Sequence, residues 1–187
     1  IRASASSASS AADASAAGYM NPNRVRKEHL PLFVEHNKRF FREADMTIAP
    51  MVLDWDEPSA AVKDAFCQFA PDGFATIVMD LHATGGKAPQ PHVWKGMAVT
   101  NLINDACNFA GPQQTAEVLY AQLKGRPKDA PGFYFFRIVW VGPSEILKTL
   151  DSLRAKHPDV ECEIVDPYTF FALFKEHYSR SNAGTAR

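Results

Sequence analysis

The sequence has few cysteines, no long apolar run and no excess of basic residues, and each absence excludes a class of protein. Its three cysteines are an odd number at wide spacing, without the pattern of a zinc site or a disulfide framework. The formal net charge is −1 and lysine and arginine are scattered, so the basic stripe of a nucleic-acid-binding protein is missing. No apolar stretch approaches the roughly 20 residues of a membrane-spanning helix, and no signal peptide pattern is present at the first residues. We therefore expect no nucleic acid and no membrane span.

A glycine-rich phosphate loop is also missing. Gly85-Gly86-Lys87 is the nearest approach, but it lacks the leading glycine and the Ser or Thr that follows the lysine in such loops. No internal repeat is present either. We therefore expect no nucleotide and no other cofactor.

What is present is the composition of an ordinary globular protein. The 187 residues are 46% hydrophobic and 22% charged, which suffices for a core that needs no disulfide. Residues 1–17 are almost entirely alanine and serine and are predicted to be a disordered tail or linker. We expect a single α/β domain over 18–178 and a flexible tail over 179–187. Because the chain starts without Met, we also expect it to be a trimmed part of a longer parent.

Strand and helix patterns alternate along the domain. Runs of apolar, β-branched and aromatic residues predict strands at 47–54, 74–80, 97–105, 132–141 and 161–165. Amphipathic spacing and capping residues predict helices at 25–44, 58–69, 112–124, 144–156 and 168–177. The connection 81–95, rich in glycine and proline, is predicted to be a functional or mobile loop. This alternation predicts an α/β fold with a mainly parallel sheet of about five strands, either barrel-like or open and three-layered.

Three of the predicted strands end in an acid, at Asp54, Asp80 and Asp105. The carboxyl ends of neighbouring parallel strands meet at one edge of a sheet, where open α/β folds and barrels place ligands and catalysis. The sequence therefore predicts a carboxylate cluster at this edge, with Asp54 and Asp80 as the catalytic pair.

Other chemical groups accompany these acids. Asp56 follows Asp54 by two residues, on the same side of an extended chain, although an acid there also suits the start of the next helix. His82 follows Asp80 in the same way, and a carboxylate orients an imidazole as a general base. Asp80 as a hydrogen-bond acceptor for loop amides and His82 as a packing residue are the structural alternatives. With His92, the pair is also a weaker candidate for a metal site.

Aromatic side chains supply flat apolar faces near the acids. Trp55 and Trp94 fall at the ends of predicted elements, whereas Trp140 is expected in the core. Sugar rings stack on such faces while their hydroxyl groups bond to neighbouring polar side chains. We therefore predict a carbohydrate cleft whose substrate-binding residues are Tyr19, Trp55, Asp56, His82, His92, Trp94 and Asp105.

The order of segments carries a family resemblance. Gly18-Tyr19-Met20-Asn21-Pro22 opens the domain, the acid-ending strands and the aromatic strand at 132–140 follow, and VDPYTFFALFKEHY closes it. Over about residues 16–178 this resembles the C-terminal domain of the GxGYxYP glycoside hydrolase family. The name-giving motif falls on Ala16 to Pro22, where Gly18, Tyr19 and Pro22 are kept while Ala16 and Asn21 replace a glycine and a tyrosine.

The resemblance implies a barrel-like α/β region within a larger secreted or cell-surface carbohydrate-processing protein, beside an N-terminal companion region. No established catalytic residues carry over from the family. The leading hypothesis is a glycoside hydrolase-like domain that acts on an oligo- or polysaccharide. The alternatives are a non-catalytic carbohydrate-binding or assembly module and, more weakly, a metal-dependent enzyme that uses Asp80, His82 and His92.

Overall fold

The computed structural model describes residues 20–54, 57–78, 90–103, 111–125, 131–136 and 142–184. Contacts divide the chain into two compact units, residues 1–101 with 165–187 and residues 102–164. The first unit contains η1 (Pro22–Arg24), η2 (Lys27–His29), α1 (Leu30–Glu43), β1 (Ile48–Asp54), α2 (Ala60–Phe66), β2 (Gly73–Val78), β3 (His92–Trp94), most of β4 (Met97–Ile103) and α5 (Pro167–Gly184). The second contains the end of β4, α3 (Gly111–Leu123), β5 (Phe135–Phe136) and α4 (Pro143–Lys156).

The sheet is mainly parallel, which confirms the predicted fold class. Its strand order is β1-β2-β4-β3, with β5 paired to the end of β4. β1 pairs in parallel with β2, and β2 in parallel with β4, whereas β3 runs antiparallel to β4. In the second unit, Leu102 and Ile103 of β4 pair in parallel with β5. The described residues therefore form a five-stranded mixed sheet in which β3 alone is antiparallel.

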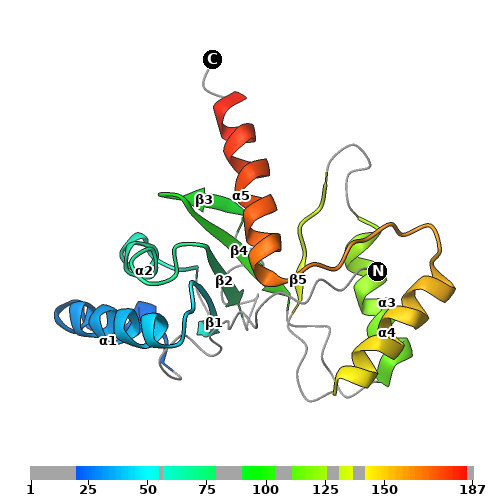
Figure 1. The fold of residues 1–187 in the computed structure, drawn as a ribbon, viewed down its shortest axis with the longest axis horizontal. Coiled ribbons are helices and arrows are strands. Elements are labelled where there is room, and N and C mark those ends of the chain that lie inside the picture. The colour runs from blue at the N-terminus through cyan, green and yellow to red at the C-terminus, as the bar shows by residue number, and fades with distance from the viewer. Residues whose placement is uncertain are drawn as a thin grey trace. The chain divides into compact units, whose positions relative to one another are not determined.

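Both faces of the sheet are covered in the first unit. Phe74 stacks on Phe66 of α2 at a ring-centroid distance of 4.1 Å, within a core that also includes Phe33 and Phe41 of α1. Successive strand residues point to opposite faces, so Gly73 faces the other side. A Cβ atom at Gly73 would lie 2.4 Å from a ring carbon of Phe171 in α5. Helices α1 and α2 therefore cover one face and α5 covers the other (Figure 1).

The second unit has a small core between α3 and α4. Ala116, Leu119 and Leu153 are buried in it, and Tyr134 packs against them. At its border, the ring of His157 stacks on Tyr120 with a centroid distance of 3.5 Å. This unit therefore holds together mainly through the packing of two helices.

The first helix begins later than predicted. The spacing predicts a helix over 25–44, but α1 begins at Leu30 and is preceded by the short turns η1 and η2. Pro31 lies in the first turn of α1. A proline ring there has no amide to donate and would clash with a carbonyl one turn earlier, so the helix cannot extend back through it.

The loop predicted over 81–95 contains a strand. His92–Trp94 forms β3, which returns into β4 through Lys95 and Gly96. Both turn residues have positive φ, 48° and 87°, as a two-residue type I′ hairpin requires. The prediction missed it because proline and glycine dominate the segment, although a glycine between two short apolar runs is the usual signal of such a turn.

The strand predicted over 161–165 is wrong. These residues adopt no regular structure, and Glu161 to Ile164 are exposed. Their alternating pattern favours an extended chain, but an extended segment becomes a strand only where a neighbour accepts its backbone hydrogen bonds, and no strand of the described chain does so. At the end of the chain, α5 runs to Gly184 and is therefore longer than the predicted helix at 168–177.

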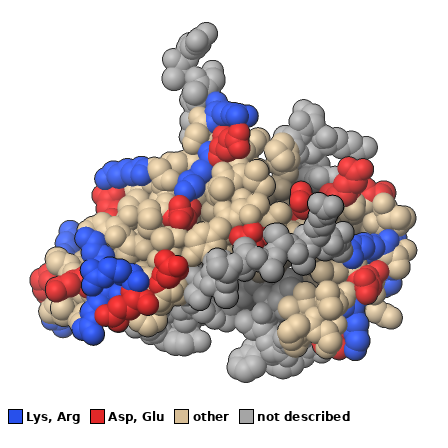
Figure 2. Space-filling model, in the orientation of Figure 1, with Lys and Arg blue, Asp and Glu red and all other residues tan. Residues whose placement is uncertain are grey.

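The helices in the described part of the chain include none that is long and apolar enough to cross a membrane. On the face shown in Figure 2, basic and acidic side chains are interleaved at the end of the first unit that α1 occupies.

Candidate functional site

Three parallel strands of the sheet are neighbours, and the carboxyl ends of two of them, β1 and β2, lie side by side. Ala49 pairs with Phe74 and Phe74 with Val99, so β1, β2 and β4 are neighbours that run in the same direction. Asp54, the last residue of β1, pairs with Val78, the last residue of β2. Aligned ends, the geometric premise of the predicted carboxylate cluster, are therefore present in the backbone for β1 and β2. We call this the carboxylate edge.

Most predicted site residues lie outside the described part of the chain. Asp54 is described as a strand residue, without its side chain. Asp80 follows the last residue of β2 by two positions, and Asp105 follows the last residue of β4 by two positions. The predicted residues that lie outside the description are Tyr19, Trp55, Asp56, Asp80, His82 and Asp105. Their roles stay predictions.

The end of β1 carries an irregularity. Met51 pairs with Thr76 and Asp54 with Val78, so β1 uses three steps where β2 uses two. One extra residue in one strand is the register of a β-bulge, a feature over-represented next to active sites. The register shift lies between Met51 and Asp54, the first of the predicted catalytic acids.

Asn23 ties the N-terminal segment to the loop after β1. Its amide nitrogen donates to the carbonyl oxygen of Glu57 at 2.9 Å, and its amide oxygen accepts from the backbone N–H of Ser59 at 3.0 Å. Asn21 caps η1 by accepting from the backbone N–H of Asn23. The segment just after the Gly18-Tyr19 motif is therefore hydrogen-bonded to Glu57 and Ser59, which follow Asp54 by three and five residues. Sequence reasoning missed this role, because an asparagine that bridges two loops leaves no periodic signal.

His92 and Trp94 lie together, but away from the carboxylate edge. Trp94 pairs with Met97, the first residue of β4, whereas the carboxylate edge lies at the other end of that strand. The indole N–H of Trp94 donates to Asp64 at 2.8 Å, and Lys63 Nζ lies 3.9 Å from the centroid of the indole ring, in cation–π geometry. A sugar that stacked on this face of Trp94 would have to displace Lys63.

Both ring nitrogens of His92 already have partners. Lys63 Nζ lies 3.3 Å from Nε2, and Nδ1 lies 2.8 Å from the carbonyl oxygen of Gln90. Because an ammonium group only donates, Nε2 accepts and Nδ1 carries the proton. Among the described residues, no group of three or more potential ligands could hold a metal ion.

Asp64 organises this second cluster. It accepts from Trp94 and pairs with Lys95 at 2.8 Å. The hydrogen bond from Lys95, followed by that from Trp94, holds the pKa of Asp64 below its ordinary value. The Asp64 carboxylate is thus kept charged by its neighbours, which is the behaviour of a structural anchor for the β3–β4 hairpin.

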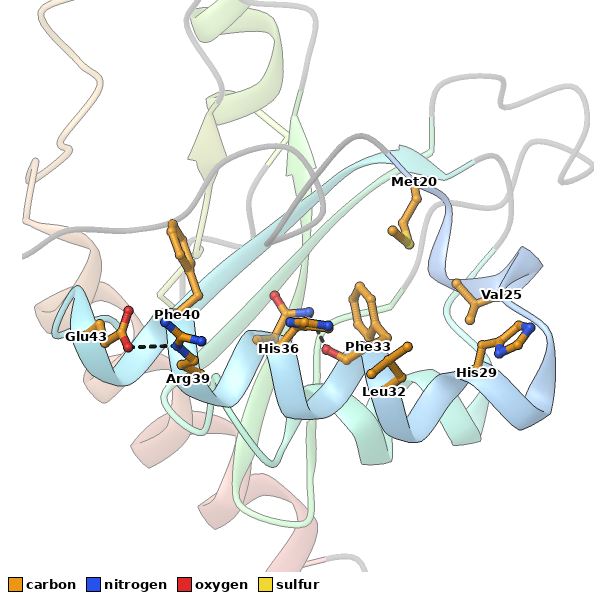
Figure 3. A pocket seen from close by; sticks show the side chains of 10 residues that line it. Met20, Val25, His29, Leu32, Phe33, His36, Arg39, Phe40 and Glu43 are labelled. Carbon is orange, nitrogen blue, oxygen red and sulfur yellow. Dashed lines mark hydrogen bonds and ion pairs between the residues drawn. The ribbon is translucent and has the colours of Figure 1, made fainter.

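A groove runs along the outer side of α1, with a volume of about 520 Å³. We call it the α1 groove. Five lining residues are apolar and five are polar, namely Met20, Val25, His29, Leu32, Phe33, His36, Asn37, Arg39, Phe40 and Glu43. Figure 3 shows Met20 and Val25 lying across from the side chains of the helix. The sequence held a signal for it, since Leu32 and Phe40 lie off the buried face formed by Phe33, Val34 and Phe41.

One comparison with known proteins gave a match. The family model described as GxGYxYP putative glycoside hydrolase C-terminal domain matches residues 10–175. The matched range includes the motif segment and every described element from η1 to the middle of α5. Neither the curated proteins nor the solved structures gave a significant match.

Proposed function

Because the match shows that the chain belongs to the GxGYxYP putative glycoside hydrolase C-terminal domain family, we propose that it acts on a polysaccharide through acids at the carboxylate edge. The single observation that carries the proposal is the parallel pairing of β1 with β2, in which Asp54, the last residue of β1, is the register partner of Val78, the last residue of β2. The sequence supplies an aspartate at or just after each of these ends.

The chemistry needs two carboxyl groups in different protonation states. In glycoside hydrolysis one acid protonates the leaving oxygen, and the other attacks the sugar or activates water. Asp54 and Asp80 take these roles in our proposal, since β1 and β2 are adjacent and Asp54 pairs with the last residue of β2. A separation of about 5 to 5.5 Å between the carboxyl groups would give retention of configuration, and about 6.5 to 9.5 Å would give inversion.

Further residues would bind the substrate around this pair. We propose Tyr19 and Trp55 as stacking faces, and Asp56, His82 and Asp105 as hydrogen-bonding partners of sugar hydroxyl groups. His92 and Trp94 would serve a substrate that reaches the opposite end of β4, after displacement of Lys63. Membership of a glycoside hydrolase family also favours an extracellular or cell-surface location.

Two isosteric substitutions test the catalytic pair. Asp54→Asn and Asp80→Asn each remove a titratable oxygen without changing side-chain size. We expect each to lower hydrolysis of a polysaccharide panel, measured as released reducing ends, by at least about a hundredfold, as loss of a general acid or base does. The melting temperature should stay close to that of wild type, because each substitution exchanges one oxygen for an amide nitrogen and keeps the size of the side chain.

Asp151→Asn is the matched control. Asp151 is an exposed aspartate in α4 whose ion pair with Arg154 has a loose 3.8 Å separation, and its substitution should change neither activity nor melting temperature. Wild-type turnover in both Asp54→Asn and Asp80→Asn would refute the assignment of the pair.

A non-catalytic carbohydrate-binding module is the second candidate. It is favoured by the description of the matched family as a C-terminal domain, which places it in the architecture of larger proteins. Calorimetric binding of an oligosaccharide by wild type, Asp54→Asn and Asp80→Asn alike, without any product, would identify this function instead of hydrolysis.

A further inference from the structure

We propose that the α1 groove is a binding groove for a linear sugar chain and that it continues the carboxylate edge along α1. This inference rests on the proposed function, because it names where the polysaccharide beyond the reacting unit would lie. Two observations carry it, the position of the groove and the chemistry of its lining.

The groove begins close to the carboxylate edge. Met20 and Val25 line one wall, and Asn23 lies between them in the sequence. Asn23 is bonded to Glu57 and Ser59, in the loop that follows Asp54. A sugar chain bound across the end of β1 would therefore pass the η1 segment and enter the groove. All of these residues belong to the first unit.

The lining combines apolar faces with planar polar groups. Leu32 and Phe40 are 53% and 47% exposed, so both offer apolar surface to a ligand. Between them lies His36, whose imidazole is exposed. At the far end Arg39 and Glu43 form an ion pair of 2.9 Å, which places a guanidinium and a carboxylate side by side (Figure 3).

A carbohydrate chain uses both kinds of surface at short intervals. A sugar ring has an apolar C–H face and a rim of hydroxyl groups, each of which donates and accepts hydrogen bonds. Imidazole, guanidinium and carboxylate groups supply the matching partners, while the phenyl ring of Phe40 supplies the platform. The groove floor also includes Asn37, whose side chain is fully buried and donates to the carbonyl oxygen of Phe33 at 2.8 Å.

The groove is also long rather than round. Leu32 and Glu43 both line the groove and are eleven residues apart on α1, and a helix rises about 1.5 Å per residue, so they are separated by about 16 Å along the helix axis. A docked amphipathic helix would need an uninterrupted apolar strip, whereas here His36 separates Leu32 from Phe40. An extended chain of several sugar units suits this surface better.

The test is calorimetric binding of named oligosaccharides to the full chain. Cellohexaose, xylohexaose, maltohexaose and chitohexaose are the probes, each compared with its disaccharide. We expect at least one hexasaccharide to bind, at least tenfold more tightly than its disaccharide. Phe40→Ala should weaken that binding at least tenfold and His36→Ala at least threefold.

Two controls make the result specific. Leu173→Ala removes an apolar side chain of the same exposure, 46%, from α5 in the same unit and outside the groove, and it should leave binding unchanged. Asp54→Asn should also keep hexasaccharide binding, because it alters the reacting centre and not the groove. Circular dichroism of each variant verifies that it is folded.

The failures of the two proposals are distinguishable. Three results would refute the proposal that the α1 groove binds a sugar chain. They are wild-type affinity in Phe40→Ala and His36→Ala, no binding of any hexasaccharide, and binding of an apolar helical peptide instead of the hexasaccharides. Loss of binding in both groove variants, together with unchanged hydrolysis in Asp54→Asn and Asp80→Asn, would support the groove and refute only the catalytic pair.

Discussion

Asp72 shows how a single carboxylate can link distant segments of the first unit. It accepts a hydrogen bond from the Thr47 hydroxyl at 2.6 Å and pairs with Lys175 of α5 at 2.9 Å. Burial alone would raise the pKa of Asp72, but the hydrogen bonds from Thr47 and Lys175 outweigh it and leave the pKa below its ordinary value. The ionised form is thus favoured by folding, and the turn before β2 is tied to the helix on the sheet's far face.

The first prediction concerns the pH dependence of stability at Asp72. A carboxyl with a lowered folded pKa stabilises the fold above its unfolded pKa, about 3.9, and loses that contribution as pH falls through the folded value. We expect Asp72→Asn to have a lower free energy of unfolding than wild type at pH 7. The two should converge on acidification below about pH 4, in urea titrations from pH 7 to about pH 3.

Asp159→Asn is the control for this experiment, because Asp159 is an exposed aspartate in the second unit. Its pH profile should follow that of wild type. Parallel profiles for Asp72→Asn and wild type would contradict the prediction.

At the residue scale, the sequence could place acids but not their partners. Asp54 was predictable as the end of an apolar run, and β1 does end there. The partners of Asp72 lie 25 and 103 positions away, and no local pattern encodes contacts of that separation. The same holds for Trp94, whose contacts with Lys63 and Asp64 depend on how β3 packs against α2.

At the scale of elements, caps and turns decide where regular structure begins and ends. The described helices α2, α3 and α4 begin within two residues of their predicted starts. Elements whose limits depend on a single residue or on a pairing partner were less predictable. Pro31 keeps α1 from beginning earlier, and Gly96 supplies the positive φ that the turn of the β3–β4 hairpin requires. Residues 161–165 lack a partner strand among the described residues.

The N-terminus of α5 provides the second prediction. Asp166 accepts hydrogen bonds from the backbone N–H groups of Tyr168 and Thr169 at 2.9 and 3.1 Å, and from the Thr169 hydroxyl. These bonds satisfy donors that the first turn leaves open. Asp166→Ala should therefore cost about 1 kcal/mol, the usual value of a lost cap.

Replacement by other capping residues separates the cap from the charge. Asp166→Asn and Asp166→Ser should keep most of the stability in urea unfolding, because both accept from the same backbone groups. If Asp166→Ala unfolded like wild type, or if Asp166→Asn were as unstable as Asp166→Ala, capping would not be the role of this side chain.

At the scale of the whole molecule, the candidate site depends on strand order, which the sequence does not contain. The strands follow one another in the chain as β1, β2, β3, β4, but their spatial order is β1-β2-β4-β3. The hairpin turns β3 outward and leaves β4 beside β2. The pairing of β1 with β2 and of β2 with β4 confirms the prediction that the acid-ending strands are neighbours. They are neighbours because the strand between β2 and β4 in the sequence, β3, is short and pairs antiparallel on the outer side of β4.

The last prediction concerns Asn23, which joins the segment after the Gly18-Tyr19 motif to the loop after Asp54, 34 and 36 positions along the chain. Asn23→Ala removes both hydrogen bonds and should cost about 1 kcal/mol for each. Asn23→Asp keeps the acceptor for Ser59 but sets a carboxylate against the carbonyl oxygen of Glu57, so its stability should be intermediate. Hydrogen exchange at the Ser59 amide, which Asn23 protects directly, should accelerate in Asn23→Ala and much less in Asn23→Asp.

These exchange and stability results distinguish a local clasp, by which we mean the two hydrogen bonds from Asn23 to Glu57 and Ser59, from a general destabilisation of the first unit. The control Gln122→Ala removes an exposed amide side chain from α3 and should change neither stability nor exchange at Ser59. If the clasp holds the loop that carries Trp55 and Asp56, Asn23→Ala should also lower polysaccharide turnover while its melting curve remains a single cooperative transition. Unchanged exchange at Ser59 in Asn23→Ala would show that other contacts fix the loop, and the motif segment would then have no demonstrated connection to the carboxylate edge.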